Sequence, residues 1–146
     1  MTTSTSEAIV LKLYHAVDTI GRIDNQRIIQ WIELLRRRPA DEVFNALVGV
    51  FCNTDRPTCC YLDQEYAGRL LLAVKPPCSQ DIQSVIKRTL ATWDLSIEEL
   101  PFYFSDVFGA EAVLQALDAL DRVDNSQQEK KAIRTFRFWL HARRDN

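Results

Sequence analysis

The chain has few of the residues that interrupt regular structure, with 4 glycines and 5 prolines among its 146 residues. Because both residues favour turns and end helices, their scarcity predicts long helices joined by short loops. Long apolar runs are also missing, since charged residues interrupt each of them well before the roughly 18 residues that a membrane helix needs. The chain does not open with a basic segment followed by an apolar one. We therefore expect a soluble cytoplasmic protein with no membrane contact.

Motifs that carry known chemistry are missing too. The sequence contains no glycine-rich phosphate loop, no His-Glu-x-x-His helix and no nucleophile elbow. Its four cysteines are Cys52, Cys59, Cys60 and Cys78. Zinc sites usually offer ligand pairs that are separated by two to four residues, which these cysteines do not. The two histidines, His15 and His141, lie near opposite ends of the sequence. We predict packed, reduced thiols, no cofactor and no metal; a small enzyme with an unrecognised site is the least favoured alternative.

Size and charge fit one ordinary domain. A chain of 146 residues with 47% hydrophobic and 26% charged residues has the composition of a single globular domain. We expect one helical domain over residues 1–146, with a flexible lead at 1–5 and a frayed tail at 144–146. The formal net charge of −2 argues against a protein that coats nucleic acid through bulk charge, although it leaves room for a local basic patch.

Apolar residues recur at spacings of three and four along nearly the whole chain, which is the pattern of amphipathic helices. The helical stripes fall within residues 9–20, 24–38, 41–51, 58–75, 79–93, 96–108, 113–120 and 133–140. Capping boxes are predicted at three helix starts, Ser4 with Glu7, Ser96 with Glu99 and Ser126 with Glu129. A strand at 70–74 is the best competing assignment, but it has no second strand to pair with. The sequence predicts an all-α fold of about eight antiparallel helices.

One repeated spacing within the sequence suggests how these helices are arranged. Trp31 precedes Pro39 by eight residues, Trp93 precedes Pro101 by the same spacing, and an apolar helical pattern follows each proline. Helix pairs recur about every 35–40 residues, the range of two-helix repeats. The pattern over 24–121, with Pro39 and Asp41 near the positions expected of a repeat unit, resembles the HEAT and armadillo-like α-α superhelix class. That resemblance implies a short right-handed superhelical stack that binds other proteins. A compact helical bundle is the alternative fold.

Charge is distributed unevenly near the C-terminus. Residues 94–125 carry 8 acids and 1 base, a net charge of −7, whereas 127–146 carry 6 bases and 2 acids, a net charge of +4. Such an acidic hairpin followed by a basic helix either pairs its charges internally or presents a polarised surface to a partner. Both interpretations are open from the sequence.

These patterns predict a non-enzymatic protein-interaction module, of a regulatory or adaptor kind, whose partner is another protein. The expected binding face consists of acids and exposed aromatics, namely Glu98, Glu99, Phe102, Tyr103, Asp118 and Asp121. The alternative function is association with nucleic acid through two basic clusters, Arg36, Arg37 and Arg38 in one and Lys130, Lys131 and Arg134 in the other.

Overall fold

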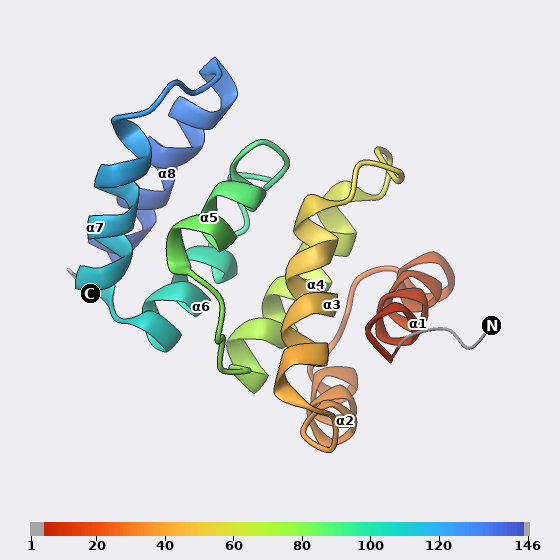
Figure 1. Ribbon diagram of the computed structural model, residues 1–146. Helices are drawn as coiled ribbons and strands as arrows, with labels where there is room; N and C mark the ends of the chain where they lie inside the picture. The colour runs from red at the N-terminus through yellow and green to blue at the C-terminus, as the bar shows by residue number, and fades with distance from the viewer. Residues whose placement is uncertain (1–4, 145–146) are drawn as a thin grey trace.

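The computed structural model describes residues 5–144, and all of its regular elements are helices (Figure 1). They are α1 (Thr5–Ile20), α2 (Asn25–Leu35), α3 (Ala40–Cys52), α4 (Cys60–Val74), α5 (Ile82–Leu90), α6 (Glu99–Phe108), α7 (Ala110–Asp121) and α8 (Gln127–Arg144). Within residues 5–144 the prediction of an all-α fold with about eight helices is confirmed. The described part of the chain contains no strand, and the competing strand at 70–74 is wrong because these residues belong to α4. None of the helices within residues 5–144 combines the length and apolar character needed to cross a membrane.

The helices lie in two rows that run side by side. In one row α1 packs on α3, α3 on α5 and α5 on α7, while in the other α2 packs on α4, α4 on α6 and α6 on α8. The rows are joined where α3 meets α4, where α6 meets α7 and where α7 meets α8. As a result α1 and α2 lie at one end of the molecule and α7 and α8 at the other (Figure 1). The described residues therefore form a compact stack of helices.

Helix ends follow the expected local rules at several places. Gly21 has a φ of +82°, which a glycine adopts without strain, and it ends α1. The carboxylate of Asp24 accepts the backbone N–H of Arg27 at 2.8 Å and so caps α2. At α8 the predicted capping box is confirmed, because Ser126 and Glu129 each accept the other's backbone N–H.

The capping box predicted at Ser96 is wrong. Its hydroxyl donates to the carboxylate of Asp94 at 2.6 Å, and α6 begins at Glu99 without a side-chain cap. Pro101 lies in the first turn of this helix, where a missing N–H costs little. Ser4, the third predicted cap, lies outside the described residues. Thr5 is the first residue of α1 and Arg144 the last of α8, so the rest of the predicted lead and tail is outside them too.

The core lies between the two rows. Its largest fully buried side chains are Trp93, Tyr66, Tyr103, Phe44, Phe51, Phe104 and Phe136. Gly68 lets α4 approach the start of α6, since a Cβ there would lie 3.1 Å from side-chain atoms of Ile97 and Glu99. The repeated tryptophan–proline spacing in the sequence does not mark equivalent places: Trp31 lies within α2, whereas Trp93 lies in the loop between α5 and α6.

Candidate functional site

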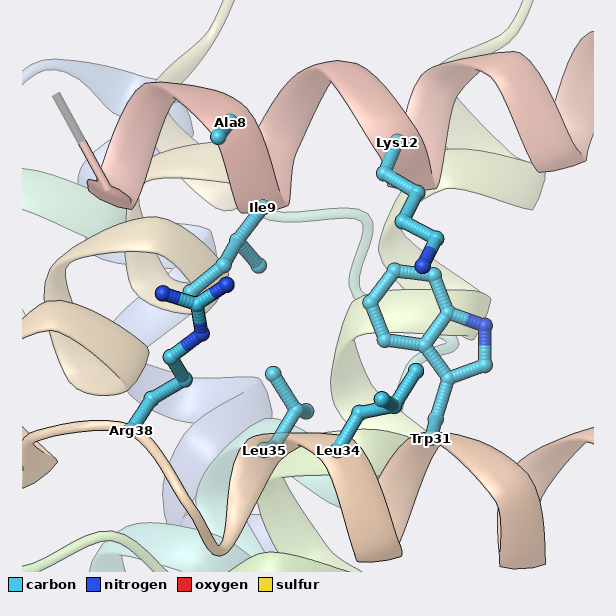
Figure 2. A pocket seen from close by; sticks show the side chains of 7 residues that line it. All are labelled: Ala8, Ile9, Lys12, Trp31, Leu34, Leu35 and Arg38. Carbon is cyan, nitrogen blue, oxygen red and sulfur yellow. The ribbon is translucent and has the colours of Figure 1, made fainter. Parts of the chain in front are cut away.

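A groove separates α1 from α2 at one end of the stack. Both helices bury their apolar faces against the next layer, α1 on α3 and α4 and α2 on α4. Between them lies a cavity of about 120 Å³. Its lining residues are Ala8, Ile9 and Lys12 from α1, and Trp31, Leu34, Leu35 and Arg38 from α2 and the residues that follow it (Figure 2). The groove is therefore built from two consecutive helices that are both supported by α4.

The apolar floor of the groove is fixed by a buried aromatic pair. Trp31 donates its indole N–H to the hydroxyl of Tyr66 at 2.8 Å, and the two rings meet edge-on with centroids 5.9 Å apart. This hydrogen bond satisfies the polar atoms of both buried rings and locks the indole in place. Leu34 is 46% exposed, so it adds open apolar surface beside this rigid floor.

Two cations stand at opposite ends of the groove. In Figure 2 Lys12 reaches down from α1 toward the Trp31 ring, and Arg38 reaches up toward Ile9. The Lys12 Nζ lies 5.7 Å from the centroid of the Trp31 ring, a cation–π distance. Neither cation has an ion-pairing carboxylate within residues 5–144. An apolar cleft with positive ends suits a ligand that is apolar in the middle and acidic beside it.

A second hollow begins on the other side of Arg38. It measures about 170 Å³ and is lined by Leu35, Arg36, Arg38, Ala40, Val43, Val74, Pro76 and Pro77. Leu35 and Arg38 are common to both hollows. The Arg36 side chain is also without a carboxylate partner among the described residues, whereas Arg37 lies 3.9 Å from Glu33. Arg36 and Arg38 of the predicted basic cluster thus border apolar hollows, whereas Arg37 lines neither.

The predicted acidic and aromatic face needs correction at Tyr103. Its ring is fully buried, and its hydroxyl donates to the carbonyl oxygen of Pro76, so a partner cannot reach it. Burial raises the pKa of this phenol. Phe102 is half-buried and packs edge-on against Trp139, while the Arg143 guanidinium lies 4.5 Å from the centroid of its ring. Both rings are therefore engaged within the protein.

The four acids of the predicted face have different surroundings. Asp118 and Asp121 accept from Arg137 of α8 at 2.7 and 3.0 Å. Glu99 lies beside Gly68 of α4, and burial raises the pKa of its carboxyl group. Glu98 is half-buried at the start of α6. The internal-pairing interpretation explains Asp118 and Asp121, and the structure does not gather the six predicted residues into one open face.

The two predicted basic clusters lie far apart. Arg36, Arg37 and Arg38 follow α2 at one end of the stack, whereas Lys130, Lys131 and Arg134 are exposed on α8 at the other end (Figure 1). A single phosphate-binding surface therefore does not join them.

Three of the cysteine thiols have surroundings that disfavour the thiolate. Burial raises the pKa of Cys52, Cys60 and Cys78 above the ordinary value. Cys60 borders a hollow with Asn53, Thr54, Arg56, Pro57 and Thr92, which supplies no imidazole base. Within residues 5–144, no three His, Cys, Asp or Glu side chains are grouped as a metal site.

The sequence patterns do not predict the groove, although they single out one of its residues as functional. Arg38 belongs to the predicted basic cluster, while Lys12, Ile9 and Leu34 attracted no functional interpretation. The only local signal is the run Leu34-Leu35 directly before three arginines, which places apolar and basic side chains on one helix end. The groove itself depends on how α1 and α2 are spaced, and no pattern within either helix reports that spacing.

Comparisons with protein-family models, curated proteins and solved structures give no match to this chain.

Proposed function

We propose that this chain is a non-enzymatic protein-interaction module that binds a segment of another protein in the groove between α1 and α2. The segment places an apolar side chain over Trp31 and Leu35, and acidic residues beside it meet Lys12 and Arg38. The observation that carries the proposal is the pair of cations, without carboxylate partners in the described chain, at the two ends of a rigid apolar cleft. We also propose, from the sequence resemblance, that the stack belongs to the HEAT-like class.

The size of the cleft supports a side-chain anchor over a free small molecule. Pockets for small ligands usually measure about 300–1,000 Å³, whereas this cavity measures about 120 Å³. An engineered cavity of about 150 Å³ holds a benzene molecule. One branched or aromatic side chain is thus a fitting occupant. Binding hot spots are of this kind, with an anchor in a desolvated pocket surrounded by polar contacts.

The test uses a phage-displayed library of random linear peptides, selected on the immobilised full chain. Enriched peptides are synthesised with a fluorophore, and their dissociation constants are measured by fluorescence polarisation. We expect peptides in which an apolar residue has Asp or Glu neighbours. Ala8→Phe, which fills the groove from α1, is expected to weaken them about tenfold or more, since it excludes one buried side chain. Arg38→Glu is expected to weaken them by a similar factor through charge reversal.

Matched controls lie away from the groove. Ala91→Phe adds the same ring at an exposed turn, and Arg134→Glu reverses an exposed cation on α8. Both are expected to leave the affinities within twofold. The proposal fails if Ala8→Phe and Arg38→Glu behave like these controls, or if no peptide binds more tightly than about 100 μM. It also fails if a mixed-sequence oligonucleotide binds at low salt with steep salt dependence while peptides do not, which is the nucleic-acid alternative.

A further inference from the structure

We infer that the partner segment continues beyond the groove, crosses Arg38 and places a second apolar side chain in the hollow beneath Arg36. This inference rests on the proposed function and adds the chemical pattern of the ligand. The partner carries two apolar anchors with an acidic residue between them, and the acid lies over Arg38.

The two hollows form one continuous site because they share a wall. Leu35 and Arg38 line both of them, so a chain that leaves the groove at Arg38 enters the second hollow directly. Figure 2 shows Arg38 at the end of the groove opposite Lys12, where the ligand would leave it. A ligand confined to the first hollow would leave uncovered the half-buried Val74 and the exposed Pro77 next to its own end, with Val43 and Pro76 buried beneath them.

Each hollow has room for one side chain. Their volumes are about 120 and 170 Å³, on either side of the roughly 150 Å³ that accommodates a benzene ring. The second hollow has a stiff wall, because Pro76 and Pro77 restrict the backbone there and the Pro76 carbonyl is held by Tyr103. A preformed wall reduces the entropic cost of binding.

The electrostatics at the shared wall define what lies between the anchors. Arg36 and Arg38 both line the second hollow, and neither pairs with a carboxylate within residues 5–144. An Asp or Glu held there by two neighbouring apolar anchors forms charge-assisted hydrogen bonds with the guanidinium groups. Phosphates of a nucleic acid would match these charges, but a nucleic acid brings no aliphatic side chains for hollows walled by leucine, valine and proline. The lining therefore favours a protein segment.

The experiment uses the peptides enriched on the wild-type chain as probes. In each, the second apolar residue is replaced by alanine, and binding to wild type and to Ala40→Phe is measured by fluorescence polarisation. Ala40, the first residue of α3, lines the second hollow and does not line the groove. We expect Ala40→Phe to weaken the parent peptides about tenfold. The alanine-substituted peptides are expected to bind both proteins equally, because their second anchor is already gone.

The outcomes separate this inference from the proposed function. If Ala40→Phe leaves the parent peptides within twofold of wild type while Ala8→Phe weakens them tenfold, the second hollow is unused and the inference is overturned, but the groove stands. If neither variant has an effect, the proposed function fails as well. Thermal unfolding of Ala40→Phe checks its fold, and the alanine-substituted peptides test the second anchor on the unmodified protein. Equal binding of parent and substituted peptides to wild type overturns the inference by itself.

Discussion

Arg56, in the loop between α3 and α4, connects three parts of the protein through one guanidinium group. Its Nε donates to Asp63 of α4 at 2.8 Å, and its Nη2 donates to Asp18 of α1, also at 2.8 Å. The same group lies 4.4 Å from the centroid of the Tyr14 ring. Because the Asp63 side chain is only 5% exposed, the charge of this carboxylate depends on Arg56 for compensation.

Loss of this arginine is expected to be costly. Arg56→Met keeps much of the side-chain length but leaves Asp63 buried without its cation, so we expect a loss of about 3 kcal/mol in the free energy of unfolding. Urea denaturation measures it. Arg37→Met is the control, because Arg37 and Glu33 are both exposed and 3.9 Å apart; we expect a change below about 0.5 kcal/mol. Equal effects of the two substitutions would contradict the role assigned to Arg56.

Single residues also show the limit of sequence reasoning. Phe102, Tyr103 and Phe104 are consecutive, and one helix cannot turn all of them toward a single neighbour, so an exposed ring is the natural prediction. The structure instead surrounds α6 with α4, α7 and α8, which bury Tyr103 and cover most of Phe102. The number of neighbours around a helix is a tertiary property, and periodicity within the helix does not report it.

At the scale of the element, two serine–glutamate pairs with the spacing of a capping box form different structures. Ser96 and Ser126 both precede a glutamate by three residues. Only Ser126 accepts the backbone N–H of its glutamate; Ser96 lies in a turn where Asp94 accepts both its N–H and its hydroxyl. In that turn Trp93 donates its indole N–H to the Ile97 carbonyl at 3.0 Å, so the buried ring organises the backbone before α6 begins.

The difference predicts unequal responses to the same substitution. Ser126→Ala removes a true N-cap of α8 and is expected to lower the free energy of unfolding by about 1 kcal/mol. Ser96→Ala removes an exposed hydroxyl that caps no helix, and we expect a change within about 0.5 kcal/mol. Thermal or urea unfolding of both variants gives the comparison. A larger loss for Ser96→Ala would restore the sequence prediction at α6.

For the whole molecule, ion pairs that join distant elements make stability depend on pH. The pKa of Asp18 lies below its ordinary value because Arg56 donates to it, and that of Glu129 is lowered by Lys87. Burial alone would raise the pKa of Asp106, but Arg143 and Lys75 outweigh it and the net direction is down. These groups bind protons more readily in the unfolded chain, so their contribution to stability is present above their unfolded pKa and is lost as pH falls through the folded value.

We therefore expect the melting temperature to fall as the pH is lowered below about 4, the ordinary range of carboxyl groups. Asp106→Asn is expected to make this acid-side decline shallower, since it removes one of the shifted groups. Glu33→Gln, an exposed carboxylate on α2, serves as the control. Calorimetry at several pH values measures the slope. An unchanged slope in Asp106→Asn would show that its ion pairs contribute nothing to the acid response.

The sequence predicted the number and kind of elements because periodicity, caps and stop residues are local. It did not predict the two rows, which arise from contacts between helices two positions apart in the chain order, such as α4 with α6. The groove is a tertiary feature of the same kind, because Lys12 and Arg38 are 26 positions apart in the sequence and line one groove only through the packing of α1 and α2 on α4.

The unequal anchoring of α1, which packs on α3 and α4, and α2, which packs mainly on α4, has a consequence for the motions of this end of the protein. Since α2 makes its main helix contacts with α4 alone, we expect local opening at this end of the protein to begin with α2. A bound segment that contacts both helices would hold α2 next to α1. The ligand binds only while α2 is in place, so it stabilises the closed state of α2 against the locally opened one. The opened fraction therefore falls as the ligand concentration rises above the dissociation constant.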